Sequence, residues 1–174
     1  EVTDPDGKVW SFVYDGSIHT VCRGRNQHIP TSDRKYSVEM TSPKLEYREM
    51  GKLQEVVRTL RRAGAGVNDS CGMHVHVDAS NHTAQSLKNA LCIMYSKEDI
   101  LFQALKVNEE RVRRWCKKVE EAKLQKIRKL SSNASLSQME DLWYSDSENS
   151  RFAHYNNTRY YALNLHSVFY RGTL

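Results

Sequence analysis

Alternating apolar and polar residues predict strands in the first quarter of the chain. Residues 8–14 form one such run, and the turn signal at 15–17 ends it. A polar, basic loop is expected over residues 19–34, and a second alternating run covers 35–40. Glu39 points away from the core in this second run, because successive strand residues face opposite sides of a sheet. Three side chains are expected to face the core: Tyr36, Val38 and Met40.

Apolar residues at helical spacing predict three helical regions in the middle of the chain. The first covers residues 45–63 and ends at the glycines of 64–66, which suit a helix C-terminus. Thr83 is a suitable N-cap for the second, and a further helical stretch follows over 97–106. The third is a long amphipathic helix over residues 108–129. Its apolar positions are Val112, Trp115, Val119, Leu124 and Ile127.

Residues 71–78 read Cys-Gly-Met-His-Val-His-Val-Asp and place two histidines at alternate positions. In a strand, His74, His76 and Asp78 share one face, and the hydrophobic residues Met73, Val75 and Val77 share the other. Neutral imidazole is a common ligand of transition metals, and protonated imidazole donates to phosphate. The pattern therefore favours a metal or phosphate site, and a purely structural pair of histidines is the alternative.

The last third of the chain has a polar region followed by aromatic-rich segments. Residues 131–150 are rich in Ser, Asn, Asp and Glu, which predicts a loop with a short helix around 137–144. The aromatic content and alternation of 159–166 predict a strand, and 172–174 begin another. This order of elements predicts an α+β fold, in which helices cover one face of a largely antiparallel sheet.

Length and composition indicate one soluble domain. The chain has 174 residues, 39% of them hydrophobic, and a mean hydropathy of −0.69. No basic-then-apolar signal pattern opens it, and no apolar stretch approaches the roughly 18 residues of a membrane span. Its first residue is Glu1 rather than Met, so we expect upstream sequence. The four cysteines form no Cys-x-x-Cys pair, and a reduced, cytoplasmic setting is the simpler interpretation.

The net charge of +5 and the pI near 9.0 suit an anionic partner such as nucleic acid or nucleotide phosphate. Much of the positive charge lies in residues 108–129. A solvated helix face is the simpler interpretation of this segment. The alternative is a nucleic-acid-binding module in which this helix contacts phosphates, although the segment interleaves few aromatic residues for base stacking.

Four motifs resemble, in their order, those of the amidoligase family. The first is Trp10 with the turn at 15–17, and the second is the segment 39–43, which reads Glu-Met-Thr-Ser-Pro. The third, Gly-Met-His-Val-His at 72–76, is similar to the Gly-Met-His-x-His strand of glutamine synthetases. The fourth is the segment 159–165, which precedes Gly-Thr-Leu at 172–174. Together the motifs cover nearly the whole chain, and the family belongs with glutamine synthetase and glutamate–cysteine ligase among the carboxylate–amine ligases.

The resemblance implies an ATP-dependent ligase that joins a carboxylate of a small molecule or peptide to an amine through an acyl-phosphate. It also implies a curved antiparallel sheet whose carboxylates and first motif histidine hold Mg²⁺ or Mn²⁺. Family members usually open with a Glu-x-Glu strand and continue after the Gly-Thr-x segment into Glu-Phe-Arg. Both lie outside these residues, so the chain resembles a fragment of a single catalytic domain that lacks the first and last catalytic strands. Whether such a fragment is active alone stays open.

This resemblance gives roles to individual residues. Glu39 and His74 are the expected metal ligands, and His76 is expected to donate to a nucleotide phosphate. Arg159 is expected to bring a fixed cation to phosphate or to the substrate carboxylate. Arg113, on the basic segment, is a further candidate for binding the anionic cofactor.

Two residues are assigned to the substrate, and each has a simpler interpretation. Asp15 lies in an Asp-Gly-Ser turn that recurs in these ligases, but Asp-Gly is also an ordinary turn. Asn164 is a polar residue in a predicted strand interior, so it either lines the site or meets a hydrogen-bond partner. A metal-dependent hydrolase that uses His74, His76 and Asp78 is a third functional class, but it lacks another histidine at familiar spacing.

Overall fold

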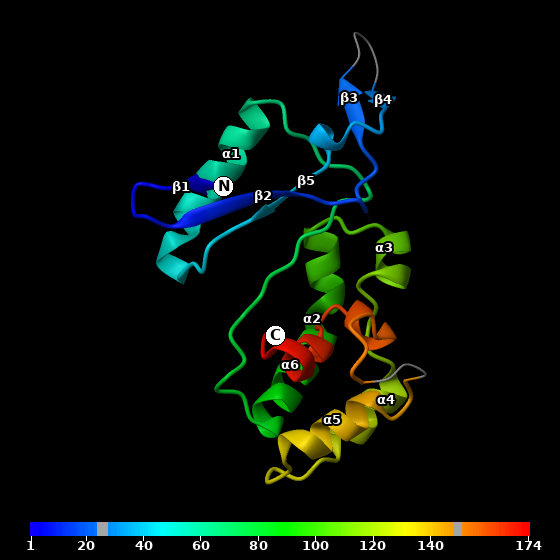
Figure 1. Cartoon of the computed structure of the whole chain (residues 1–174). Helices are drawn as coiled ribbons and strands as arrows, with labels where there is room; N and C mark the ends of the chain where they lie inside the picture. The colour runs from blue at the N-terminus through cyan, green and yellow to red at the C-terminus, as the bar shows by residue number, and fades with distance from the viewer. Residues whose placement is uncertain (24–27, 148–150) are drawn as a thin grey trace. The chain divides into compact units, whose positions relative to one another are not determined.

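The computed structural model describes residues 1–23, 28–147 and 151–174 (Figure 1). The chain divides into two compact units, Glu1–Met73 and His74–Leu174, and each is described by itself. Small antiparallel sheets lie in the first unit, and five of the six described α-helices lie in the second. This combination confirms the α+β class, whereas the single domain stays a prediction.

A three-stranded antiparallel sheet forms the first unit, with the order β1-β2-β5. Its strands are β1 (Val2–Thr3), β2 (Val9–Tyr14) and β5 (Val38–Thr41). The run over 8–14 is therefore confirmed as a strand. The second predicted strand begins later than expected, because a 3₁₀ turn, η1 (Arg34–Tyr36), precedes it and Asp33 caps that turn by accepting from the backbone of Lys35.

The predicted loop over 19–34 contains a hairpin instead. β3 (Val21–Arg23) pairs antiparallel with β4 (His28–Pro30), and residues 24–27 between them lie outside the described residues. The register sets Val21 opposite Pro30 and Cys22 opposite Ile29. Val and Ile favour extended backbone. Their short runs lie among polar residues, so the hydrophobic pattern does not predict these two strands.

Helix α1 (Met50–Arg62) follows a 3₁₀ turn, η2 (Tyr47–Glu49), and confirms the helix expected over 45–63. It ends as expected at Gly64, whose positive φ of 100° places it in the left-handed region that glycine adopts readily. Two ion pairs join this part of the chain to the β1–β2 hairpin. Lys8 contacts Glu49 at 2.7 Å, and Lys52 contacts Asp6.

Four helices form the core of the second unit (Figure 1). They are α2 (Ala84–Ala104), α4 (Glu121–Arg128), α5 (Leu136–Tyr144) and α6 (Leu165–Arg171). The predicted N-cap Thr83 accepts from the backbone of Ser86 at 3.2 Å, and the stretch expected over 97–106 continues α2 without a break. The largest fully buried apolar side chains of this core are Leu87, Leu91, Leu124, Ile127, Met139, Trp143 and Leu165.

The expected helix over 108–129 is wrong, because the chain leaves the helical path in its middle. α3 (Glu109–Arg114) ends at Trp115, and α4 starts only at Glu121. Between them the backbone of Lys117 donates to the Tyr160 carbonyl at 2.7 Å and accepts from Ala162 at 2.8 Å. This pairing with a distant segment takes the groups that a continuous helix would use.

The expected strand over 159–166 is wrong as well. The segment forms a 3₁₀ turn, η3 (Asn157–Tyr160), and then enters α6. Asn156 accepts from the backbone of Thr158 at 2.9 Å, and Asn164 accepts from that of Ser167 at 3.2 Å. Short polar side chains of this kind favour turns and helix starts over strands. The short helix expected around 137–144 is confirmed by α5, and residues 148–150 of that predicted region lie outside the described residues.

Residues 71–77 do not form the expected strand. In the described structure, the segment pairs only at its end, where Val77 and Leu174 exchange two backbone hydrogen bonds of 2.8 and 2.9 Å and Asp78 bridges Thr173. The start of a strand at 172–174 is thus limited to this bridge. Met73, Val75 and Val77 are 70%, 71% and 51% exposed, so they do not face a core. The sheet of glutamine synthetase type stays a prediction, since it relied on strands here and at 159–166.

All four cysteines carry free thiols. In the part of the chain that the structure describes, no helix is both long and apolar enough to cross a membrane.

Candidate functional site

Glu39 projects from the polar face of the sheet in the first unit. It pairs across the strands with Val13, whereas Met40 pairs with Phe12, so alternate side chains leave opposite faces. The Glu39 side chain is exposed, and within the described residues it forms no hydrogen bond or ion pair. Glu39 and Met40 therefore leave opposite faces as predicted, and the carboxylate is accessible to a cation or an amine. The expected core contacts of Tyr36 and Val38 are wrong, because each side chain is 47% exposed.

Asp15 lies at the end of β2, where its carboxylate shapes the turn. One oxygen, Oδ1, accepts from the backbone N–H of Ser17 at 2.8 Å and from the Ser17 hydroxyl at 2.7 Å. The backbone carbonyl of Asp15 accepts from the buried hydroxyl of Ser37, which precedes β5. These bonds support the ordinary turn interpretation, and a contact of Asp15 with substrate stays a prediction.

His74 and His76 begin the second unit and are both exposed. Within the described residues, neither ring forms a hydrogen bond, an ion pair or a ring contact. Asp78 accepts from the backbone and hydroxyl of Ser80 at 3.0 and 2.9 Å, so its carboxylate shapes a turn. Because 71–77 form no ladder, strand geometry does not hold the two imidazoles on one face.

The proposed metal ligands lie in different units, Glu39 in the first and His74 in the second. Among residues 1–23, 28–147 and 151–174, no group of three or more His, Cys, Asp or Glu side chains is placed to hold a metal ion. A metal site that joins Glu39 and His74 therefore stays a prediction.

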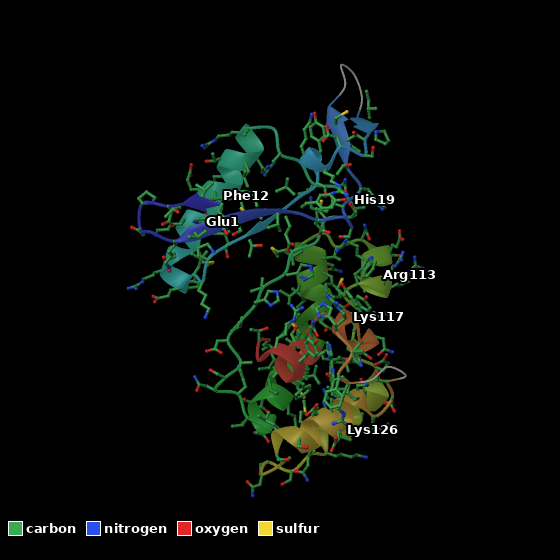
Figure 2. All side chains as sticks on the ribbon, in the orientation of Figure 1. Glu1, Phe12, His19, Arg113, Lys117 and Lys126 are labelled. Carbon is green, nitrogen blue, oxygen red and sulfur yellow. The ribbon has the colours of Figure 1, made fainter. Side chains whose placement is uncertain are left out.

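Arg159 lies in η3 between two aromatic rings. Its guanidinium carbon is 4.9 Å from the centroid of Tyr155 and 5.7 Å from that of Tyr160, and Nη1 donates to the His154 carbonyl at 3.4 Å. These contacts fix the cation at the surface. Arg113 lies on α3, and Figure 2 shows its side chain projecting from that helix into solvent. A phosphate contact of either residue stays a prediction.

Asn164 caps helix α6. Its Oδ1 accepts from the backbone of Ser167 at 3.2 Å, and its Nδ2 donates to the Ser167 hydroxyl at 3.0 Å. Both ends of the amide are thus occupied within the helix start. The structure supports the hydrogen-bonding interpretation of Asn164.

A hollow of about 380 Å³ in the second unit is lined by charges of both signs. Its polar lining residues are Glu120, Lys123, Lys126, Asp146, Asn157, Thr158 and Tyr161. Lys126 pairs with Asp146 at 3.2 Å, and the Tyr161 hydroxyl donates to Glu120. Burial, and then this hydrogen bond, raise the pKa of Tyr161, so the phenol keeps its proton. The lining therefore matches a small ligand that carries both an ammonium and a carboxylate.

Lys123 is the buried cation of this hollow, with only 3% of its surface exposed. Its Nζ donates to the Trp143 carbonyl at 2.7 Å and lies 5.6 and 5.9 Å from the ring centroids of Trp143 and Tyr161. Burial lowers the pKa of Lys123, and the carboxylates of Asp146 and Glu120 oppose that effect. The Trp143 carbonyl lies near the end of α5, where a cation is favourable.

A buried pair, Tyr144 and His166, lies elsewhere in the second unit. The Tyr144 hydroxyl is 2.5 Å from His166 Nδ1, and the rings meet edge to face. The His166 Nε2 atom is buried, and among the described residues it has no hydrogen bond of good geometry. Burial, and then the nearby Arg159 charge, lower the pKa of His166, and burial raises the pKa of Tyr144 to about 12. The imidazole is therefore neutral near pH 7 and shares a hydrogen bond with the protonated phenol.

Neither Lys123 nor His166 was predicted from the sequence, although a signal existed for the first. Lys123 stands four residues from both Val119 and Ile127, so it occupies the buried stripe of that helical region. A charged residue within an apolar stripe indicates a buried cation. His166 follows Leu165 in a segment interpreted as a strand, and its burial could not be inferred without the helix.

Comparison with known proteins gives one match. A family model described as "putative amidoligase enzyme" matches residues 1–174. No curated protein matches the chain. No solved structure matches it either.

Proposed function

The chain belongs to the amidoligase family, and we propose on this basis that it joins a carboxylate to an amine at the expense of ATP. The match over residues 1–174 is the observation that carries the proposal. It spans the acidic strand residue Glu39, the two histidines at 74 and 76, and the Arg159 segment that carry the resemblance.

The proposed reaction has two steps. A carboxylate oxygen of the substrate attacks the γ-phosphorus of ATP, and the bond from that phosphorus to the bridging oxygen breaks to release ADP. The amine nitrogen then attacks the carbonyl carbon of the acyl-phosphate, phosphate leaves with the electrons of the C–O bond, and the nitrogen loses a proton. The first step brings two anions together and the second releases anionic phosphate, so fixed cations favour both steps.

We assign phosphate binding to cationic residues of the second unit. Arg159, already held between two rings, is the proposed contact for phosphate, and exposed Arg113 is a second. His76 is the proposed donor to a nucleotide phosphate. Glu39 and His74 are the proposed donors to Mg²⁺ or Mn²⁺, which when bound would neutralise phosphate charge.

The charged hollow of the second unit is the proposed site for the amine-bearing substrate. An amino acid or peptide end presents an ammonium and a carboxylate, and the hollow offers Glu120 and Asp146 to the first and Lys123 and Lys126 to the second. Substrates that carry both charges are therefore the first to test.

The test measures ADP release from ATP with Mg²⁺ or Mn²⁺ across a panel of amino acids and short peptides. We expect release that depends on both a carboxylate and an amine, and a higher unfolding temperature with millimolar ATP and metal, because a ligand that binds the native state stabilises it. Absence of both effects contradicts the proposal.

Two variants test whether Glu39 and His74 belong to the proposed active site. Glu39→Ala and His74→Ala are each expected to abolish ADP release while circular dichroism stays unchanged, since both side chains are exposed. Glu55→Ala and His19→Ala remove an exposed acid and an exposed histidine elsewhere and are expected to retain activity. Full activity of Glu39→Ala or His74→Ala removes that residue from the proposed site.

A further inference from the structure

Arginine and aromatic side chains alternate along one surface of the second unit. The Arg114 guanidinium lies 4.8 Å from the ring centroid of Trp115, and Trp115 meets Tyr160 edge to face at 5.2 Å. Arg159 lies over both Tyr160 and Tyr155, at 5.7 and 4.9 Å. Each group thus touches the next in an unbroken series.

The series continues onto α6. Tyr155 meets His154 at 4.6 Å between centroids, and His154 meets Tyr170 at 5.8 Å. The Arg171 guanidinium Nη2 lies 3.3 Å from His154 Nε2. We call the whole series, from Arg114 through Arg159 to Arg171, the arginine–aromatic row.

Backbone hydrogen bonds hold the segments that carry the row. Lys117, just beyond Trp115, donates to the Tyr160 carbonyl at 2.7 Å and accepts from Ala162 at 2.8 Å. Asn156 accepts from the backbone of Thr158 and fixes the start of η3. The rings of the row are therefore mounted on a preformed surface.

The aromatic rings of the row remain open to solvent. Tyr155 is 71% exposed, and Trp115 and Tyr170 are each 44% exposed. Large aromatic residues normally bury most of their surface, so three exposed rings in one connected series indicate a binding surface.

Within the described residues, the arginines of the row form no ion pair. Among the described residues, no carboxylate lies within 4.0 Å of the guanidinium groups of Arg114, Arg159 or Arg171. The arginine Arg151 of the same unit, in contrast, pairs with Asp141 at 2.9 Å and with Glu140 at 3.7 Å. The row thus combines flat apolar ring faces with guanidinium groups that can pair with an anionic ligand.

We infer that the arginine–aromatic row binds single-stranded nucleic acid. Unpaired bases stack on exposed rings, and the phosphates between them pair with arginine, which is the combination that single-strand-binding surfaces use. Duplex is a poorer match because its bases are already stacked and cannot reach Trp115 or Tyr155. This surface shares only Arg114 and Trp115 with the segment 108–129, and its other members lie in residues 154–171; the inference goes beyond the proposed ligase activity.

Fluorescence anisotropy of the full chain with labelled 20-nucleotide poly(dT) and poly(U) tests the inference, with a duplex of equal length for comparison. We expect one or both single strands to bind more tightly than the duplex. Contact of three arginines with phosphates predicts a slope of log affinity against log salt of about −2, at roughly 0.7 per phosphate. The stronger of the two single strands distinguishes DNA from RNA.

Tyr155→Ala and Trp115→Ala are each expected to weaken single-strand binding by about 5- to 150-fold, the range of one lost stacked base. Trp115→Phe is expected to retain most of the affinity. Arg114→Gln and Arg171→Gln are expected to make the salt slope shallower. The matched controls, Tyr47→Ala, whose ring is 93% exposed, and Arg58→Gln, lie in the first unit and are expected to change nothing.

Intrinsic fluorescence gives an independent measurement. Trp10 and Trp143 are buried and Trp115 is exposed, so a base stacked on the row quenches mainly Trp115. We expect poly(dT) or poly(U) to quench the wild type and to leave Trp115→Phe unquenched. Absence of binding overturns the inference, and so does equal affinity for duplex with no loss in Tyr155→Ala.

Discussion

The two units of the chain are stabilised in different ways. In the second unit, four helices and the connecting loops bury a continuous apolar cluster around Leu124 and Trp143. Among the described residues of the first unit, Trp10 is the only buried large hydrophobic side chain. That unit relies on strand pairing and on ion pairs such as Lys8 with Glu49.

The two units therefore differ in how much they contribute to folding stability. Burial of apolar surface is the dominant favourable term in folding, so the second unit holds most of the stabilising contacts. The first unit exposes Glu39 on its sheet. Substitutions in the buried core of the second unit should therefore affect folding, whereas substitutions of exposed residues such as Glu39 and His74 should affect activity alone.

Truncation of a side chain in the core of the second unit is expected to have the largest effect on the free energy of unfolding. Leu124 is fully buried, and Leu124→Ala should lower the free energy of unfolding by about 2–5 kcal/mol through lost burial and a cavity. Val57→Ala on α1, where Val57 is 41% exposed, should change it by less than about 0.5 kcal/mol. Urea denaturation followed by circular dichroism measures both, and equal losses would refute the contrast between the units.

Loss of a helix cap is expected to lower the free energy of unfolding by an intermediate amount. Asn164→Ala removes the acceptor for Ser167 N–H and should cost about 0.5–2 kcal/mol, whereas Asn164→Asp keeps that acceptor and should cost less. The same variants separate the cap from a substrate contact. If Asn164→Ala raises KM for the amine without lowering the unfolding temperature, the residue belongs to the site.

Acid is expected to affect the units in different pH ranges. The pKa of His166 is lowered by burial and by Arg159, so the unfolded state binds more protons and the second unit loses stability as pH falls below about 6.5. In the first unit, hydrogen bonds lower the pKa of Asp4, from the backbone of Lys8, and of Glu49, from the backbone of Glu46 and the Lys8 side chain. Their stabilisation is present above their ordinary pKa values and is lost only as pH falls below about 4.

Hydrogen exchange between pH 7 and 5, corrected for intrinsic rates, measures this contrast unit by unit. Protection in α5 and α6 should fall over this range, while protection in β2 and β5 should hold. His166→Gln is expected to flatten the pH dependence of the second unit. The same slope in His166→Gln and the wild type would exclude His166 as the titrating group.

Local patterns were sufficient where local contacts decide the structure. Helix α2 was predicted from its spacing and its Thr83 cap, and both follow from neighbouring residues. The break between α3 and α4 could not be predicted, because Lys117 is drawn out of the helix by Tyr160 and Ala162, more than forty positions away. At 159–166, alternation suggested a strand, whereas the two asparagines that start η3 and α6 decided the outcome.

In the candidate site as well, the sequence predicted the faces of side chains correctly only where strand pairing fixes them. Strict alternation correctly placed Glu39 on the face opposite Met40, because its strand has a partner. The same reasoning placed His74 and His76 on one face, but residues 71–77 pair with the rest of the described chain only at Val77. The family could still be recognised, since motif order depends on the sequence and not on the geometry.

The bridge between Val77 and Leu174 has a consequence for synthesis on the ribosome. Gly172, with a positive φ of 76°, ends α6 and turns the chain so that Leu174 reaches the first residues of the same unit. Its partner Val77 is synthesised almost a hundred residues earlier and has no bridge partner until then. Closure of the second unit therefore waits for the synthesis of residues 172–174, and nascent chains stalled before residue 172 should be more sensitive to protease near His76 than chains that include these residues.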